Sequence, residues 1–259
     1  MELIIYNFQR MLLIFMRISG IMFATPFFSS LVIPVRLRII FSIFLTLILS
    51  SALKNFNMAI PPHIGQYGLM ALGQLVLGLI LGFIVAIIFT AFQLAGQFFS
   101  FQMGFGIIQV YDPLSQIEIP IIGQLQYLLG IFIFLLIRAH HLLIHSLYQS
   151  FEILPFFDFS SLGHVQLLSL SLSKIFSSMF LLALKIAFPI IATMFLVAFV
   201  LGLLAKASPQ MNIFMVGFPL QIGIGLIALF IILPFFVEMI ANILDYTFDD
   251  MIRLLYTLK

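Results

Sequence analysis

Charged residues are scarce in this sequence: Asp, Glu, Lys and Arg make up 8% of its 259 residues, whereas 63% are hydrophobic. An ordinary soluble domain is about a quarter charged. So few charges cannot cover the water-facing surface of a soluble protein of this length. The composition therefore predicts an integral membrane protein whose surface is covered mostly by lipid or by other protein chains.

Cysteine and tryptophan are absent altogether. Without cysteine the chain can form no disulfide, hold no Fe–S cluster through thiolates and use no thiol nucleophile. Without tryptophan the usual aromatic belt at the membrane interface has to rely on tyrosine. The formal net charge of +2 is small, and the cationic residues are scattered rather than clustered, which argues against nucleic-acid binding.

The sequence consists largely of long apolar runs. A helix that spans the bilayer needs about 20 mostly apolar residues, and segments that meet or approach this length are predicted at 8–28, 37–53, 66–101, 121–149, 172–204 and 213–244. The first is read as a retained helix rather than a cleavable signal peptide, because Glu2 precedes it and Arg10 and Arg17 interrupt its apolar run. The expected fold class is all-α, an integral membrane-type protein of about six long, bent apolar helices.

Several segments are longer than one membrane crossing. A continuous helix over 66–101 would be about 54 Å long, against a hydrocarbon core of about 30 Å. Pro189, Pro219 and Pro234 fall inside apolar runs, where each removes a backbone hydrogen bond and favours a bend. Overlong, bent helices suit a packed assembly better than a simple bundle of straight rods.

Small and charged residues inside the apolar runs mark candidate contacts. Gly78 and Gly82 form a GxxxG pair, a spacing that lets two helices approach closely, although glycine is also common in membrane helices in general. Lys185 and Glu238 each lie deep in an apolar segment, where an unpaired charge is costly. They could neutralise one another across a helical hairpin, or each could pair with a partner subunit.

A histidine cluster lies near the end of the fourth segment, where Arg138 is followed by His140, His141 and His145. His141 and His145 are four residues apart and share a helix face, a spacing that can bind metal. Leu142 follows His141, so the HExxH motif is absent. Histidines at a membrane interface are the simpler interpretation. We predict no metal site, cofactor site or catalytic residue in this chain.

The most irregular stretch lies between the third and fourth segments, from Gln102-Met-Gly-Phe-Gly106 to Tyr111-Asp-Pro-Leu-Ser115. Gly104 frees the backbone, and Asp112-Pro113 favours a turn. The stretch lacks a GK[ST] sequence and a preceding strand, which argues against a phosphate-binding loop. A weakly charged loop between apolar helices suits a re-entrant segment or a pore plug.

Long composite motifs in a fixed order carry a family resemblance. They are Arg17-Ile-Ser-Gly-Ile21 with Pro26, Val32-Ile-Pro-Val-Arg-Leu-Arg38, Gln102-Met-Gly-Phe105 with Asp112-Pro113, Leu182-Ala-Leu-Lys-Ile-Ala-Phe-Pro189, Gly202-Leu-Leu-Ala-Lys-Ala-Ser-Pro-Gln-Met-Asn212 and Val216-Gly-Phe-Pro-Leu220. Over nearly the whole chain the sequence resembles the FliR family of flagellar export-gate proteins. Injectisome homologues of the SctT type share much of this pattern, so an injectisome gate subunit stays an alternative, as does a stand-alone secondary transporter or channel.

The resemblance implies a non-enzymatic subunit of the flagellar type III protein export apparatus. Its partners would be FliP-like and FliQ-like export-gate subunits, an FlhB-like switch protein and unfolded export substrates. Residues 1–259 would form a single export-gate membrane domain, with a FliP-like N-terminal part and a FliQ-like C-terminal part whose helices form hairpins. The expected location is a helical multi-subunit assembly in the bacterial inner membrane, at the flagellar basal body.

The resemblance also assigns roles to residues. In the family the loop after the third helical region plugs the pore, which here is the stretch from Gly104 to Pro120. The plug candidates are Gly104, Phe105, Gly106, Tyr111, Asp112 and Pro113. Positions expected to be structural or to contact other subunits are Lys206, Pro209, Gln210, Asn212, Gly217 and Pro219.

Overall fold

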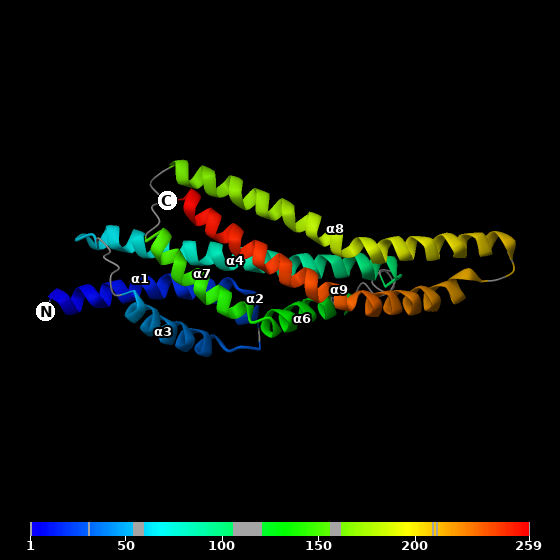
Figure 1. Ribbon diagram of the computed structural model, residues 1–259, viewed down its shortest axis with the longest axis horizontal. Coiled ribbons are helices and arrows are strands. Elements are labelled where there is room, and N and C mark those ends of the chain that lie inside the picture. Colours follow the sequence, from blue (N-terminus) through cyan, green and yellow to red (C-terminus); the bar gives the residue numbers. More distant parts are fainter. Residues whose placement is uncertain are drawn as a thin grey trace. The chain divides into compact units, whose positions relative to one another are not determined.

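Every regular element in the part of the chain that the computed structural model describes is a helix. The described residues are 2–30, 32–53, 60–105, 121–155, 162–208, 210 and 212–258. In chain order the helices are α1 (Glu2–Ala24), α2 (Pro26–Ser29), α3 (Val35–Ala52), α4 (Ile64–Gln102), α6 (Ile121–Leu136), α7 (Ala139–Ile153), α8 (Leu162–Ala207) and α9 (Ile213–Thr257) (Figure 1). The predicted all-α fold is confirmed.

Four of the described helices are long and apolar enough to cross a membrane: α3, α4, most of α8 and most of α9. The pair α6 and α7 makes a fifth candidate if it counts as one broken span. The first predicted segment, 8–28, forms most of α1 and of α2. Helix α1 is not among these candidates, since Asn7, Gln9 and Arg10 interrupt the apolar residues of its first half. The chain therefore has the character of a multi-pass membrane protein.

The last two helices extend beyond their predicted ends. The apolar run of α9 was expected to end at 244, but the helix continues to Thr257 because its final turns are amphipathic. Phe248 and Met251 are buried there, whereas Asp249 and Asp250 are exposed. Similarly, α8 begins ten residues before the predicted start at 172, in a serine-containing stretch. Hydropathy marks only the apolar part of each helix.

The fourth predicted segment, 121–149, is two helices rather than one. The chain breaks at Ile137 and Arg138, and Arg138 adopts a left-handed backbone conformation with φ 60° and ψ 29°. This conformation costs a residue with a side chain about 1–2 kcal/mol. By contrast, α8 continues through Pro189, and α9 continues through Pro219 and Pro234. Neither proline nor glycine marks the break in the sequence.

The chain divides into two compact units, and each draws on both halves of the sequence. The first unit consists of Met1–Ile87, Arg138–Phe176 and Leu244–Lys259, and the second consists of Ile88–Ile137 and Ser177–Ile243. In the first unit α1 packs against α3 and the start of α4. In the second unit the end of α4 and α6 pack with the hairpin that α8 and α9 form.

Candidate functional site

A fully buried arginine organises the first unit. Arg17 of α1 is 0% exposed. Its Nε donates to Oε1 of Gln74 at 2.7 Å, and its Nη1 donates to the carbonyl oxygen and the hydroxyl of Ser150 at 2.7 and 3.1 Å. Its Nη2 donates to the carbonyl oxygens of Leu154 and Pro155 at 2.8 and 3.1 Å. Each nitrogen of the guanidinium therefore has a partner.

These contacts hold the end of α7 against α1 and α4. The guanidinium bonds the Ser150 carbonyl, which also accepts from the Leu154 N–H, and the carbonyls of the two residues that follow α7. The Phe151 ring lies under the guanidinium at 4.2 Å, an arrangement that favours a cation. Gln74 ties in α4, because its Nε2 also donates to the Pro155 carbonyl at 2.7 Å. Sequence reasoning noted Arg17 only as an interruption of an apolar run and as part of a family motif.

Helices α1 and α4 touch backbone to backbone beside this network. A Cβ atom at Gly78 would collide with the Arg17 carbonyl oxygen, and one at Gly20 would collide with Leu75. A Cβ atom at Gly82 would lie 2.7 Å from that of Ala24. The structure therefore places both glycines of the predicted GxxxG pair at a close crossing with α1, which small residues make possible.

In the second unit, α4 crosses α6 just as closely. A Cβ atom at Gly96 would collide with the Cα of Gly123 and lie 2.9 Å from Oε1 of Gln126. One at Gly130 would lie 2.8 Å from the Phe92 ring. The chain leaves α4 and re-enters through α6, so this crossing joins the two helices on either side of the predicted plug.

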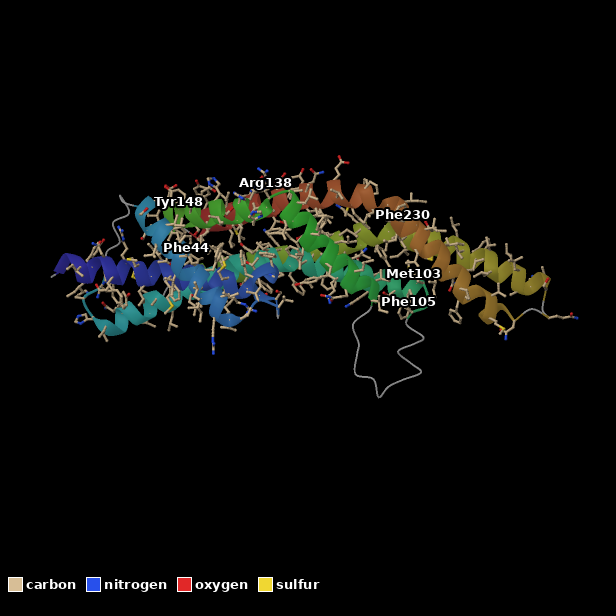
Figure 2. The ribbon with its side chains drawn as sticks, turned by 90° about the horizontal axis from the view of Figure 1, so that it is seen from below. Phe44, Met103, Phe105, Arg138, Tyr148 and Phe230 are labelled. Carbon is tan, nitrogen blue, oxygen red and sulfur yellow. The ribbon has the colours of Figure 1, made fainter. Side chains whose placement is uncertain are left out.

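The start of the loop between α4 and α6 packs against α9, at Met103 and at Gly104, the first residue of the predicted plug. Met103 is fully buried, and its terminal methyl would lie 2.5 Å from a Cβ atom at Gly225. Gly104 has φ +86°, and a Cβ atom there would lie 2.9 Å from the Phe218 ring. Figure 2 labels Met103 and Phe105 at the end of α4. The structure thus brings the start of this loop next to the Gly217–Pro219 stretch, which the sequence singled out separately. The remaining plug candidates, Gly106, Tyr111, Asp112 and Pro113, lie outside the described residues.

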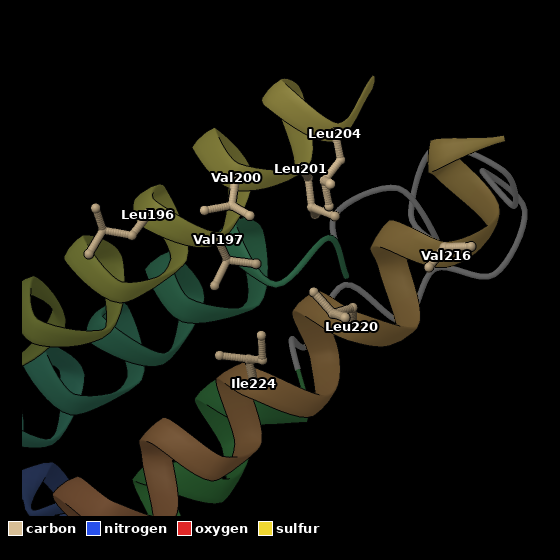
Figure 3. Close-up of a pocket in the computed structure, with 8 residues that line it drawn as sticks. All are labelled: Leu196, Val197, Val200, Leu201, Leu204, Val216, Leu220 and Ile224. Carbon is tan, nitrogen blue, oxygen red and sulfur yellow. The ribbon is translucent and has the colours of Figure 1, made fainter. Parts of the chain in front are cut away.

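The turn between α8 and α9 is polar, and the helices beside it are not. Lys206, Gln210 and Asn212 are exposed, and Pro209 lies outside the described residues. Asn212 precedes α9 and accepts hydrogen bonds from the Met215 backbone N–H, at 3.0 Å through its carbonyl and at 3.4 Å through Oδ1. An aliphatic groove of about 370 Å³ runs between the two helices (Figure 3). Its lining residues are Leu196, Val197, Val200, Leu201, Leu204, Val216, Leu220 and Ile224.

The two deep charges do not meet. Lys185 and Glu238 are both exposed, and neither contributes to an ion pair within the described part of the chain. The alternative left by the sequence, pairing with another chain, stays a prediction. In the histidine cluster, the rings of His140 and His141 lie 4.5 Å apart. Among the described residues no group of His, Cys, Asp and Glu is arranged to hold a metal ion.

Apolar helices that leave much of their surface uncovered, held by backbone-close crossings, define a multi-pass membrane protein of a larger assembly. Residues 8–247 match the family described as bacterial export proteins, family 1. The flagellar biosynthetic protein FliR of Bacillus subtilis (strain 168) is 35% identical over 98% of each chain. FliR of Aquifex aeolicus (strain VF5) is 32% identical, over 90% of this chain and 88% of its own. FliR of Escherichia coli (strain K12) is 27% identical, over 93% and 88%.

The chain therefore belongs to family 1 of the bacterial export proteins and is of the flagellar FliR type. The resemblance seen in the sequence is confirmed. Membership makes the chain a structural component of the flagellar export apparatus, a membrane-associated assembly of several subunits, rather than an enzyme.

Proposed function

We propose that this chain is a gating subunit of the flagellar type III export apparatus in the bacterial inner membrane. It forms part of the wall of an export pore together with FliP-like and FliQ-like subunits, beside an FlhB-like switch protein. Unfolded export substrates pass through that pore, and the loop between α4 and α6 closes it. The observation that carries this proposal is the uncovered apolar surface of α8 and α9.

The lengths of α8 and α9 indicate that other protein chains cover their apolar surface. The helices have 46 and 45 residues, which makes each about 70 Å long, against about 30 Å of hydrocarbon in a bilayer. In an apolar 18-residue stretch of each helix, only 33% of the stretch in α8 and 22% of that in α9 are buried within the chain, compared with 67% in α4. Phe188 is 71% exposed on α8 and Phe230 is 76% exposed on α9. Lipid can cover less than half of each helix, so neighbouring subunits must cover most of the rest.

The position of the loop between α4 and α6 supports a plug. Its start packs on α9 through Met103 and Gly104, and the helices on either side are joined where Gly96 meets Gly123. Between these points the sequence carries only two charged residues, Asp112 and Glu118. A loop fixed at its base and poor in charge can sit in a pore and leave it without moving the helices that carry it.

Purification from gently solubilised membranes tests the assembly. We expect an affinity-tagged chain to co-purify with FliP-like and FliQ-like subunits and to aggregate when it is produced alone. A matched pair of variants tests whether the exposed apolar face of α8 is the contact: Phe195→Asp places a charge on this face, whereas Ser173→Asp places one at an exposed polar position of the same helix. Loss of partners in the first variant only is the expected result. A monodisperse monomer that binds a small solute would identify a stand-alone transporter instead.

Deletion of the loop tests the plug. Removing Gly106–Ser115 should leave the complex assembled and make the membrane leak ions or small solutes. Replacing the same residues by an equally long Gly/Ser segment is the matched control for loop closure, and it should leak as well, because the plugging side chains are gone. A tight membrane in both variants, with assembly verified, contradicts the plug.

A further inference from the structure

Helix α3 buries a mixed face of hydroxyl and leucine side chains and exposes an apolar face, which a water-soluble protein would bury. The residues that it buries are Ser42, Leu45, Thr46 and Leu49. The two hydroxyls bond inside their own helix: Ser42 Oγ donates to the Arg38 carbonyl at 2.8 Å, and Thr46 Oγ1 donates to the Ser42 carbonyl at 2.7 Å. The inward face is thus satisfied without water or any other chain.

The outward face of α3 is a continuous band of large apolar side chains. Ile40 and Phe44 are each 60% exposed, and Leu47 is 50% exposed; Phe44 is labelled in Figure 2. The band also includes Leu37, Ile39, Phe41, Ile43 and Ile48. No charged residue lies between Arg38 and the end of the helix. Contact of this face with water would be costly.

Cations bracket the helix at both ends. At the start, Arg38 Nη2 donates to the carbonyls of Ser29, Ser30 and Ile33 at 3.1, 2.6 and 2.9 Å. Arg36 is exposed and has no hydrogen bond or ion pair with the described residues. At the other end, Arg10 of α1 donates to the Ser50 carbonyl at 3.2 Å. In the sequence, Lys54 comes two residues after the last residue of this helix. Cationic side chains at the ends of an apolar span extend toward the headgroups of a bilayer.

The length of α3 matches one bilayer, unlike those of α8 and α9. Its 18 residues span about 27 Å, close to the hydrocarbon thickness of about 30 Å. We propose that α3 is a lipid-facing helix of this chain: phospholipid acyl chains cover its outward face, and Arg36 lies among the phosphate groups of one leaflet. The long arms of α8 and α9 face subunits, whereas α3 faces the bilayer.

Single cysteines can report this environment, since the chain has none of its own. Ile40→Cys, Phe44→Cys and Leu47→Cys are spin-labelled in the complex assembled with its partner subunits, in nanodiscs of phosphatidylethanolamine and phosphatidylglycerol. Collision with oxygen, which concentrates in lipid, and with a water-soluble nickel chelate is then measured by electron paramagnetic resonance. Leu45→Cys, on the buried face of the same helix, is the matched control. The unsubstituted complex, labelled in parallel, gives the background from cysteines of the partners.

Lipid contact predicts a several-fold higher oxygen accessibility at 40, 44 and 47 than at 45, with low nickel accessibility at all four positions. The ratio of oxygen to nickel accessibility should be highest at 44, nearest the middle of the span. Low accessibility to both reagents at the three outward positions would mean that a protein subunit covers this face and would overturn the proposal. High nickel accessibility would place the face in water and overturn it too. Three independent outward positions keep the test decisive if one variant fails to assemble.

Discussion

Replacing Arg17 by methionine tests whether the buried guanidinium holds α7 in place. Methionine keeps much of the length and the apolar stem but removes every donor. Three backbone carbonyls near the end of α7, the Ser150 hydroxyl and Gln74 then lose a partner in a site that water does not reach. The Leu154 carbonyl and Oε1 of Gln74 then lose the only partner that the described residues give them, whereas the Ser150 carbonyl keeps the Leu154 N–H and the Pro155 carbonyl keeps Nε2 of Gln74.

The cost follows from the kind of bonds that are lost. A hydrogen bond to a charged group contributes about 1.5–3 kcal/mol, but the five bonds share one side chain and are not additive. Truncating one partner of a buried charged network costs about 3–5 kcal/mol. At 1.4 kcal/mol for each factor of ten, this loss raises the population with a detached α7 about a thousandfold. Arg17→Lys keeps the charge but loses the planar fork, so it should fall between the variant and the native protein.

Hydrogen exchange measured by mass spectrometry on the purified complex follows this opening directly. Peptides that cover α7 should lose protection in Arg17→Met, and the thermal midpoint should fall by about 10 °C, at about 2–4 °C for each kcal/mol. Arg253→Met is the matched control, because Arg253 is 79% exposed and its contact with Asp250 is 4.0 Å long. Native protection of α7 in Arg17→Met, together with a midpoint within about 2 °C of the native one, would refute the reasoning.

Three further predictions concern the thermal midpoint of the same complex. Gly78→Ala should lower the midpoint, because the new Cβ meets the Arg17 carbonyl. Gly68 has open space around it, so the control variant Gly68→Ala should leave the midpoint unchanged or raise it slightly. Equal effects of the two variants would contradict the close crossing. Gln126→Met should raise the midpoint. Gln126 is 5% exposed, and neither atom of its amide is hydrogen-bonded within the described residues, so removing the amide should stabilise the complex by about 1–3 kcal/mol. A lower midpoint would show that the amide has a partner. Gly104→Ala should cost about 1–2 kcal/mol through its positive φ and the Phe218 ring, and an unchanged midpoint would mean that this turn adapts freely.

The sequence predicted the helices better than their ends. Runs of apolar residues located each long helix, since burial in lipid or protein requires them. Hydropathy fails where a helix turns amphipathic, as α9 does when Phe248 and Met251 stay buried while Asp249 and Asp250 face outward. It also fails at Arg138, where the break depends on tertiary packing rather than on a residue type that disrupts helices.

Contacts of the site could be predicted only where the spacing of residues along one helix indicates a close approach to another helix. Gly78 and Gly82 stand out because four residues make one helical turn, and the structure places them at the crossing with α1. Arg17 did not stand out, although a charge inside an apolar run is itself a signal. Its partners on α4 and α7 are far away in the sequence, and no local pattern indicates where they lie.

The choice of partners for Arg17 has a consequence for how such proteins diverge. Three of the oxygens that it binds belong to the main chain, at Ser150, Leu154 and Pro155. A backbone carbonyl is supplied by any amino acid, so mutation of a side chain at these positions does not delete it. Side chains at Leu154 and Pro155 can therefore change in related chains while these carbonyls remain, although the Ser150 hydroxyl is a partner in its own right. A search for compensating changes between oppositely charged positions would not detect this anchor.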